Sequence, residues 1–397
     1  MKILYIWDAD YPWDVRVEKI CTSLLNRGNE VYIAARNLKR RPEYEKRDGL
    51  HICRLKSYRN DRVNYALSFP AFFSPFWKRF IDAIVVTHGI EMIIVRDLPL
   101  AIAGIWAGRR HAVPVMLDMA EDYVALIRDI WKARKFKGFN LVVRNPYLAR
   151  MVERYAFKNV DHVLIVVNEA LQTVVSGGGD PGRVTIVGNT PSLKAFGNSA
   201  GPANDHLGLI SRRFSAIYTG GIQLGRGIQT VLEALPEIVK KIPDFLFVVV
   251  GDGYASNHLR TMVREKRLAD QVLWAGWVDH EKVFDYIKAS KVGLIPHLVS
   301  DHVNTTVPNK IFDYMGCGIP VLCSDSDPMK RIVAEERCGL TFKSGNAQDL
   351  ARTIVELHET EFQYGARGAE AVKRKYNWEE DEKRLYTAVE LTRGERV

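Results

Sequence analysis

The chain has 397 residues, of which 47% are hydrophobic and 26% are charged, and its formal net charge is +9. Its length predicts two domains of similar size, because a single core seldom serves more than about 250–300 residues, and its apolar runs are too short for a membrane-spanning helix. The five cysteines are scattered and show no C-x-x-C spacing, so neither a disulfide framework nor a zinc site is indicated.

The first half of the chain alternates strand and helix patterns. An apolar strand at 3–7 is followed by a helix at 15–27 and a strand at 30–34, which is the order of a βαβ unit with a parallel sheet. Because the first residues enter a strand directly, we expect no signal peptide and a cytoplasmic protein. The pattern continues with strands at 91–95, 113–117 and 162–167 and with helices at 98–109 and 147–157.

Two turns of the first half carry candidate functional side chains. Asp14 and Arg16 follow the first strand and are expected on the acceptor side, although Asp14 also suits the N-cap of the next helix. Asp118, Glu121 and Asp122 follow the strand at 113–117, so three carboxylates are expected at the edge of the sheet. Glu121 or Asp122 is a candidate catalytic acid or base, and a capping or surface role is the alternative.

The positive charge is concentrated at 36–62 and 128–158, and aromatic residues lie within or beside both stretches. Basic and aromatic side chains together are typical of proteins that bind an anionic membrane surface. The alternative is that the aromatic rings fill the core and the charges form a solvated face. Nucleic acid is not expected as a partner, because no recognised binding module accompanies the charge. The aromatic residues are Phe69, Phe72, Phe73, Phe76, Trp77, Trp131, Phe136 and Phe139.

A polar, turn-rich segment separates the two halves and predicts domains at 1–200 and 201–375. Residues 376–397 include an amphipathic helix that is expected to return to the first domain. Two doubly wound α/β domains would face each other across a cleft, where ligands of parallel sheets usually bind. The second half repeats the alternation, with strands at 215–219, 246–251, 272–275 and 292–295 and helices at 228–239 and 258–267.

The turn that opens the second domain is rich in glycine and leads into a helix. Gly220 and Gly221 let the backbone approach a phosphate closely, and Arg226 can bond two phosphate oxygens with its planar guanidinium. The alternative is a glycine-rich turn with a solvent-facing arginine. Gly251 ends the next strand and borders the same edge, while Trp277 follows another strand, where its ring either contacts a nucleobase or packs.

The segment 304–322 joins a polar loop, a short helix and a buried strand. Its backbone N–H groups and hydroxyls at a helix N-terminus favour an anion, and Lys310 adds a positive charge. Asp313 lies on the same helical face, where its carboxylate can accept both hydroxyls of a ribose. With Arg226, Lys310 would clamp a diphosphate and stabilise it as a leaving group. The predicted donor-binding residues here are Thr305, Thr306, Val307, Pro308, Asn309, Lys310 and Asp313.

Two D-x-D tripeptides, at 8–10 and 325–327, look like the metal ligands of some transferases. Each simply follows a strand in a turn, where aspartate is favoured for its own hydrogen bonding. We therefore expect no metal and no other cofactor.

The sequence PNKIFDYM at 308–315, followed by GIPV at 318–321, resembles glycosyltransferase family 4. The members of this family are retaining enzymes of the GT-B fold that use nucleotide-activated sugars. The resemblance covers nearly the whole chain, and the turn at 220–227 and the segment 278–297 belong to it. It implies two Rossmann-like domains and a nucleotide-sugar that is a substrate rather than a cofactor.

The resemblance also implies roles for single residues. Asp313 stands at the second Glu of the family's E-x7-E motif, a ribose ligand, whereas the first Glu, which contacts the transferred sugar, falls at Thr305. Arg226 matches the basic residue before glycine that contacts the diphosphate. The family's other cation falls at Gly221, and Lys310 is expected to compensate for it.

The first domain also matches a family pattern. Residues 118–121 correspond to a D-x-H-E-like sequence with Ala120 at the histidine, which makes Glu121 the nearer functional candidate. Together these features predict a glycosyltransferase that moves a hexosyl or N-acetylhexosaminyl group, with retention, from a UDP- or GDP-sugar to a lipid-linked or glycan acceptor. The expected setting is cell-surface polysaccharide assembly, in the cytoplasm or at the inner face of the cell membrane.

Two other functions fit the same residues. A sugar-nucleotide epimerase of the GT-B type would use the same fold and donor site. A non-catalytic protein that binds sugar nucleotides or membranes is the second alternative, because Thr305 and Ala120 depart from the family pattern.

Overall fold

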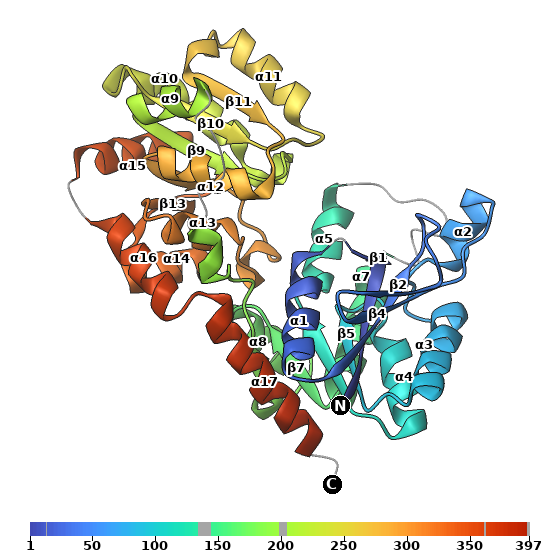
Figure 1. Ribbon diagram of the computed structural model, residues 1–397. Coiled ribbons are helices and arrows are strands. Elements are labelled where there is room, and N and C mark those ends of the chain that lie inside the picture. Colours follow the sequence, from blue (N-terminus) through green and yellow to red (C-terminus); the bar gives the residue numbers. More distant parts are fainter. Residues whose placement is uncertain (13, 134–143, 198–204, 361–362, 395–397) are drawn as a thin grey trace. The chain divides into compact units, whose positions relative to one another are not determined.

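The computed structural model describes residues 1–12, 14–133, 144–197, 205–360 and 363–394 (Figure 1). Contacts divide the chain into two compact units. Unit 1 comprises Met1–Gly188 and Asp381–Val397, and unit 2 comprises Asn189–Glu380. Each unit is built on its own parallel sheet with helices packed against it, so the predicted class of two doubly wound α/β domains is confirmed.

The sheet of unit 1 has the strand order β3-β4-β2-β1-β5-β6-β7-β8. All neighbours are parallel except β3 and β4, which form an antiparallel hairpin at one edge. Its central strands are buried on both faces, which explains their near-continuous apolar sequences. The strands are β1 (Lys2–Asp10), β2 (Glu30–Arg36), β3 (Tyr44–Arg47), β4 (Leu50–Arg54), β5 (Met92–Arg96), β6 (Val115–Met119), β7 (His162–Ile165) and β8 (Val184–Ile186).

The helices of unit 1 begin at polar caps that the sequence supplies. Asn60, Ser74 and Asn145 each accept hydrogen bonds from backbone N–H groups of the first turn, and proline follows two of them directly. The final helix of the chain packs on α1, where the Tyr386 hydroxyl donates to the Ser23 carbonyl at 2.9 Å. The helices are α1 (Val15–Asn26), α2 (Asp61–Leu67), α3 (Pro75–His88), α4 (Ala101–His111), α5 (Tyr123–Ala133), α7 (Pro146–Asn159), α8 (Leu171–Ser176) and α17 (Trp378–Gly394).

The sheet of unit 2 is entirely parallel, with the order β11-β10-β9-β12-β13-β14. The strands are β9 (Ser215–Thr219), β10 (Leu246–Val250), β11 (Val272–Gly276), β12 (Val292–Ile295), β13 (Val321–Ser324) and β14 (Gly339–Phe342). The helices are α9 (Asp205–Arg212), α10 (Ile228–Lys241), α11 (Ser256–Glu265), α12 (His280–Ala289), α13 (Lys310–Gly316), α14 (Asp327–Glu336), α15 (Ala347–Glu359) and α16 (Tyr364–Arg374).

The direction of winding reverses once in each sheet. The reversal lies between β1 and β5 in unit 1 and between β9 and β12 in unit 2. Loops that leave the carboxyl ends of these strands diverge, and the crevice between them is where parallel sheets bind ligands. We call the two positions the β1/β5 and β9/β12 switch points.

The connection between the units differs in detail from the expected boundary near residue 200. Contacts place the division after Gly188, and the segment that follows packs on unit 2. The Phe196 ring meets the Phe284 ring edge-on at 5.5 Å, and Lys288 donates to the Phe196 carbonyl. A turn-rich composition therefore marks the connection but does not tell which unit it packs against. Among the described helices, none is both long enough and apolar enough to cross a bilayer.

Candidate functional site

The strand ends at the β9/β12 switch point are built from closely packed backbone. Gly220 follows β9 and donates to the Val250 carbonyl at 2.8 Å. Gly251 follows β10 with a positive φ of 137°, and a Cβ atom there would lie 2.1 Å from the Gly220 carbonyl oxygen. Only glycine fits this approach, so the structure brings the predicted residues Gly220 and Gly251 together.

Arg226 ends the short turn Leu224–Arg226 and is half-buried. The next residue, Gly227, adopts a φ of 72° and serves as the N-cap of α10. A Cβ atom on Gly227 would lie 1.7 Å from the Pro296 carbonyl oxygen, so the turn rests directly on the loop that leaves β12. The turn that carries Arg226 is thereby fixed at the crevice between β9 and β12.

Lys310 reaches the same crevice from α13. Its Nζ lies 3.8 Å from the centroid of the Tyr218 ring and 3.5 Å from the position of a Cβ atom on Gly220. The Tyr218 hydroxyl in turn donates to the Gly221 carbonyl at 2.7 Å. Burial first, and the nearby positive charge of Arg226 second, hold the pKa of Lys310 well below its usual value.

The position of α13 is set by a second tyrosine. The buried Tyr314 hydroxyl accepts from the Thr219 backbone N–H at 3.1 Å, which ties the helix to the end of β9. Asp313, one residue earlier, is half-buried, and its charge acts against the other influences on the pKa of Lys310 by raising it. The carboxylate predicted to hold a ribose and the cation predicted to hold a diphosphate therefore share one short helix.

The electrostatic feature of this crevice is positive charge that no ion pair neutralises among the described residues. Within the described residues, neither Arg226 nor Lys310 forms an ion pair with a carboxylate; they contact His297 and Tyr218 instead. Two half-buried cations that form no ion pair with a described carboxylate favour an external anion, and a diphosphate offers oxygens to both.

The other residues predicted to bind the nucleotide-sugar donor differ in their hydrogen bonds and in their exposure. The Thr305 hydroxyl donates to the carbonyls of Asp301 and His302, within its own turn. Val307 is buried, whereas Thr306 and Pro308 are half-buried and Asn309 is exposed. Trp277 follows β11 with 77% of its surface exposed, so its ring is free of the core.

In unit 1, Arg16 and Asp118 form a buried ion pair. The Arg16 Nη2 lies 2.6 Å from Asp118 Oδ1, and the Tyr5 hydroxyl donates to Asp118 Oδ2 at 2.6 Å. Arg16 also donates to the carbonyls of Val187 and Gly188. Burial raises the pKa of Asp118, but the charge and hydrogen bonds of Arg16, followed by the charge of Arg96 and the hydrogen bond from Tyr5, hold it below its ordinary value. The expectation that Asp118 lies at the sheet edge is wrong, because it belongs to β6 and faces the interior.

Asp14 caps helix α1, which the sequence suggested as an alternative to a role on the acceptor side. It accepts from the backbone N–H groups of Arg16 and Val17 at 2.9 and 3.0 Å. Its Oδ1 also accepts from Arg96, which comes from the end of β5 at the β1/β5 switch point. Arg96 makes a second ion pair with its neighbour Asp97, so its charge is compensated on two sides.

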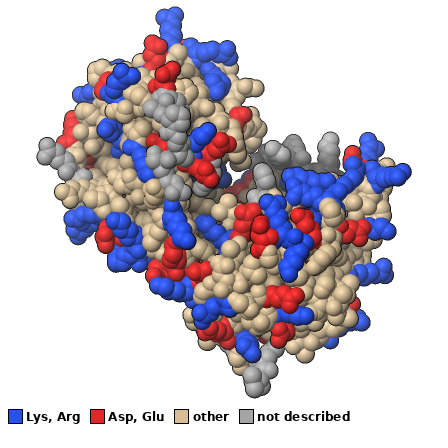
Figure 2. Space-filling view, in the orientation of Figure 1, with Lys and Arg blue, Asp and Glu red and all other residues tan. Residues whose placement is uncertain are grey.

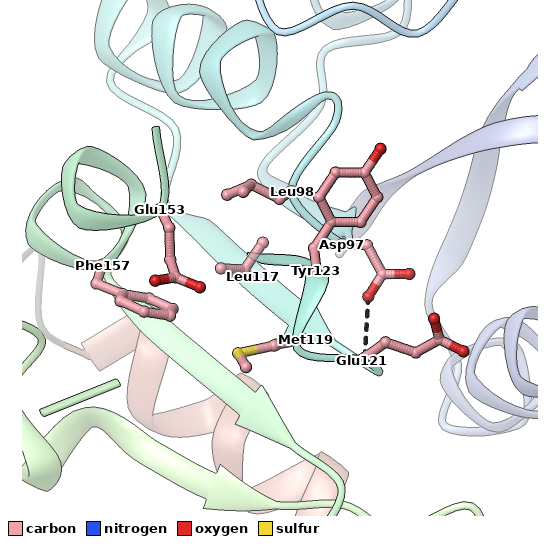
Figure 3. A pocket seen from close by; sticks show the side chains of 8 residues that line it. All are labelled: Asp97, Leu98, Leu117, Met119, Glu121, Tyr123, Glu153 and Phe157. Carbon is pink, nitrogen blue, oxygen red and sulfur yellow. Dashed lines mark hydrogen bonds between the residues drawn. The ribbon is translucent and has the colours of Figure 1, made fainter. Parts of the chain in front are cut away.

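Glu121 and Asp122 differ in what they touch. Glu121 is exposed and lines a small pocket in unit 1, where its backbone N–H donates to Asp97 at 3.3 Å (Figure 3). Asp122 is buried, accepts from the Ala125 N–H as a helix cap and accepts from the Thr173 hydroxyl. Its geometry is that of a structural carboxylate. Figure 3 shows Glu153 across the same pocket, and burial raises the pKa of this side chain to about 8.

Three side chains of unit 2 were not found by sequence reasoning. In the sequence, Tyr218 and Tyr314 look like aromatic residues of the core. The only hint of another role is the four-residue spacing from Lys310 to Tyr314, which indicates that these two residues lie on the same face of one helix. His297, 2% exposed, lies beside Arg226 at the start of the loop after β12. A histidine two residues after a buried strand is a signal that could have marked it.

The basic and aromatic stretches of unit 1 divide between core and surface. Phe72 and Trp77 are buried, while Phe73 and Phe76 are exposed. Figure 2 shows Lys and Arg side chains gathered over the part of unit 1 that carries α2. Residues 134–143, which include Phe136 and Phe139, lie outside the described part of the chain.

Helix α7 carries the clearest exposed apolar side chains of the second basic stretch. Tyr147 is 83% exposed and Met151 is 69% exposed, and Tyr155 continues the same stripe one turn later. Arg154 and Lys158 are exposed on adjacent positions of the helix. We call these five residues the α7 face.

Two family profiles match the chain. The profile described as "Glycosyl transferase 4-like domain" matches residues 14–190, and the profile described as "Glycosyl transferases group 1" matches residues 213–360. The uncharacterized glycosyltransferase MJ1069 of Methanocaldococcus jannaschii is 19% identical over 361 residues, which cover 89% of this chain and 88% of that protein. A phosphatidyl-myo-inositol mannosyltransferase of Mycolicibacterium smegmatis is 27% identical over 156 residues, only 38% of either chain.

Solved structures resemble the whole chain. Sucrose-phosphate synthase from Thermosynechococcus elongatus superposes with a TM-score of 0.76 and 20% identity and covers 98% of both chains. Anabaena Alr3699/HepE in complex with UDP-glucose gives a TM-score of 0.69 with 12% identity and covers 98% of this chain and 99% of that one. At these identities, the likeness establishes the fold.

Proposed function

Because the chain is a family 4 glycosyltransferase of the GT-B fold, we propose that it transfers a sugar from a UDP- or GDP-sugar to a lipid-linked or glycan acceptor. The donor occupies the β9/β12 switch point of unit 2. The observation that carries this assignment is the pair of half-buried cations, Arg226 and Lys310, that lack carboxylate partners among the described residues. A UDP-glucose complex is known for Alr3699/HepE, which has the same fold.

The proposed chemistry is electrostatic. The bond between the sugar and the diphosphate breaks with negative charge developing on the leaving diphosphate, and Arg226 and Lys310 stabilise that charge. Asp313 accepts the ribose hydroxyls of the donor. We propose transfer with retention of a hexosyl or N-acetylhexosaminyl group, and no metal ion is invoked.

The acceptor is assigned to unit 1. Glu121 is the proposed catalytic carboxylate, because it is exposed and its backbone is anchored by Asp97. Asp14, Arg16 and Asp122 are proposed to shape the acceptor side through the structure that they stabilise. A lipid-linked acceptor is supported by the phosphatidylinositol mannosyltransferase that matches part of the chain.

We further propose that unit 1 binds the anionic inner surface of the cell membrane. The α7 face supports this partner because it combines exposed aromatic and Met side chains with cations, the pattern of an interfacial helix. Co-sedimentation with phosphatidylglycerol vesicles at low salt tests the proposal. Tyr147→Ser with Met151→Ser should reduce binding, whereas Val86→Ser, at an exposed apolar position on α3, should not. Equal binding by both variants would contradict the assignment.

The main experiment is a thermal-shift screen of nucleotide sugars and of UDP and GDP, followed by calorimetry. Arg226→Ala and Asp313→Ala should each weaken binding of the selected nucleoside diphosphate by about 10-fold or more, equivalent to roughly 1.4 kcal/mol. Glu237→Ala, a change at an exposed residue of α10, is the matched control. Unchanged affinity in both site variants would refute the donor site.

Product analysis then identifies the reaction. Incubation with donor and acceptor should yield a glycosylated acceptor and one nucleoside diphosphate for each sugar transferred. Incubation with donor alone separates the epimerase alternative, because only an epimerase converts its donor fully without an acceptor.

A further inference from the structure

His297 lies at the β9/β12 switch point and has no role in the chemistry described above. It is the second residue after β12 and is buried to 2% exposure. The loop that carries it is fixed against the turn that carries Arg226, since Leu298 donates its backbone N–H to the Gly225 carbonyl at 3.0 Å. The close approach of Gly227 to Pro296 fixes the same two segments at a second point. The backbone therefore places His297 beside Arg226.

The side chains meet at the imidazole Nδ1. Arg226 Nη1 lies 3.5 Å from His297 Nδ1, and because a guanidinium has no acceptor, the imidazole nitrogen must accept. Accepting at Nδ1 requires a neutral ring with its proton on Nε2. Burial, followed by the positive charges of Lys310 and Arg226 and then by His302, lowers the pKa of His297 well below its usual value, so the ring is neutral at physiological pH.

The other ring nitrogen shows that His297 is not an ordinary core residue. Its Nε2 is buried and has no hydrogen-bond partner among the described residues. Leaving a buried donor unsatisfied destabilises the folded state, a cost that an apolar side chain of similar size would avoid. The position therefore carries a polar ring at a cost to stability, and the contact with Arg226 is the feature that requires it.

A neutral acceptor suits this position for an electrostatic reason. A carboxylate beside Arg226 would orient the guanidinium but would also cancel its charge and repel a diphosphate. An imidazole orients the same group and leaves the positive charge available.

Resting on the proposed function, we propose that His297 is a positioning residue for the nucleoside-diphosphate site: it holds the Arg226 guanidinium toward the diphosphate as a neutral hydrogen-bond acceptor. The role belongs to Nδ1, and it acts through Arg226 rather than by contact with the ligand.

The test compares four substitutions of His297 in calorimetric titrations with UDP and with GDP. His297→Asn places an amide oxygen near the Nδ1 position, His297→Gln places its amide near Nε2, His297→Asp adds a charge to the Asn geometry, and His297→Leu removes both polar atoms. We expect the Leu and Gln variants to bind the nucleoside diphosphate about 3- to 10-fold more weakly, as the loss of one hydrogen bond predicts. Asn should bind within about twofold of the natural chain, and Asp should bind more weakly than Asn.

A double-mutant cycle with Arg226→Ala separates positioning from a general effect on the fold. In the Arg226→Ala background, His297→Leu should cause no further loss, because the residue it positions is gone. A loss of the same size in both backgrounds would overturn the proposal. Equal affinities for the isosteric Asn and Asp variants would also overturn it, and this pair remains informative if the Leu variant fails to fold.

The two proposals fail in different ways. If Arg226→Ala itself leaves UDP and GDP affinity unchanged, the donor site of the proposed function is refuted. If Arg226→Ala weakens binding while His297→Leu binds as tightly as the natural chain, only the role of His297 is refuted. Thermal unfolding of every variant accompanies the titrations and identifies any change that comes from unfolding.

Discussion

The β1/β5 and β9/β12 switch points have the same strand order around them but hold their cations in opposite ways. In unit 1, Arg96 bonds to Asp14 at 3.0 Å and to Asp97 at 3.1 Å. In unit 2, Arg226 touches a neutral imidazole, and Lys310 lies over the ring of Tyr218. The first crevice is neutralised by the chain itself, whereas the second keeps its positive charge.

This difference indicates what each unit can bind. Strand order determines where a parallel sheet offers a crevice, but the local charge balance determines which ligand is favoured there. A diphosphate entering the crevice of unit 1 would meet Asp14, Asp97 and the exposed Glu121. In unit 2 it would meet Arg226 and Lys310, whose charges no described carboxylate pairs with. We expect substitutions in the two crevices to affect different properties, namely stability in unit 1 and nucleotide affinity in unit 2.

The largest expected effect comes from the buried ion pair of unit 1. Arg16→Met leaves Asp118 without its charged partner in the interior and should lower the free energy of unfolding by about 3–5 kcal/mol. Urea denaturation followed by circular dichroism measures this change, with each unit fitted as a separate transition where two are resolved. UDP affinity at low temperature, where the variant is folded, should be unchanged.

A surface ion pair provides the matched control for this variant. Arg27 pairs with Glu390 at 3.4 Å, and the two side chains are 60% and 69% exposed. Arg27→Met should cost no more than about 1 kcal/mol, because exposed pairs are well solvated. If Arg16→Met were as stable as Arg27→Met, the stabilising role of the internal charges of unit 1 would be disproved.

The fold was predictable because buried parallel strands leave apolar runs that alternate with amphipathic helices. β9 and β12 were found with the observed bounds. The hairpin β3–β4 was missed, because the strand Tyr44–Arg47 is mostly exposed and carries no apolar alternation. Its neighbours in the sheet, rather than its own side chains, make it a strand.

The site was predictable where local sequence determines backbone shape or charge. The glycines after β9 and the cations Arg226 and Lys310 stood out for that reason. Asp118 could not be placed, because its burial depends on Arg16, which is 102 positions away in the sequence. His297 depends in the same way on Arg226, 71 positions away. Pairings of this kind are created by the fold and leave no local pattern.

A smaller effect is expected from the pH dependence of the unit 2 crevice. The pKa of Lys310 is lowered in the free protein, so its ammonium is lost as the pH rises through that lowered value. A diphosphate favours the charged form, so binding takes up a proton above this pKa. Above about pH 7 the terminal phosphate of UDP is already fully ionised, so in that range UDP affinity should fall only as the pH rises through the lowered pKa of Lys310.

Two substitutions at Lys310 test this dependence. Lys310→Arg, whose charge persists at every accessible pH, should remove the decline, and Lys310→Met should bind about 10-fold more weakly with no decline. Calorimetry in buffers of different ionisation enthalpy measures the proton uptake directly. A decline that persists in both variants would show that another group titrates.

The smallest effect concerns Asp14, which both caps α1 and pairs with Arg96 in unit 1. Asp14→Asn keeps a good capping oxygen but removes the charge, whereas Asp14→Ala removes both. We expect the Ala variant to lose about 1 kcal/mol of stability for the cap, with the Asn variant losing only the part that belongs to the ion pair. Thermal unfolding resolves the two contributions.

The relative stabilities of the two Asp14 variants show how unit 1 neutralises the charge of Arg96. Arg96 retains Asp97 in both variants, so the loss of Asp14 alone should not leave it uncompensated. If the Asn variant were as unstable as the Ala variant, the charge on Asp14 rather than its cap would contribute most to stability, and neutralising Arg96 would require both carboxylates. If Asn behaved as the natural residue, the cap would be the main contribution, and Asp97 alone would neutralise Arg96. In either case UDP binding to unit 2 should not change, because Arg226 and Lys310 do not depend on this crevice.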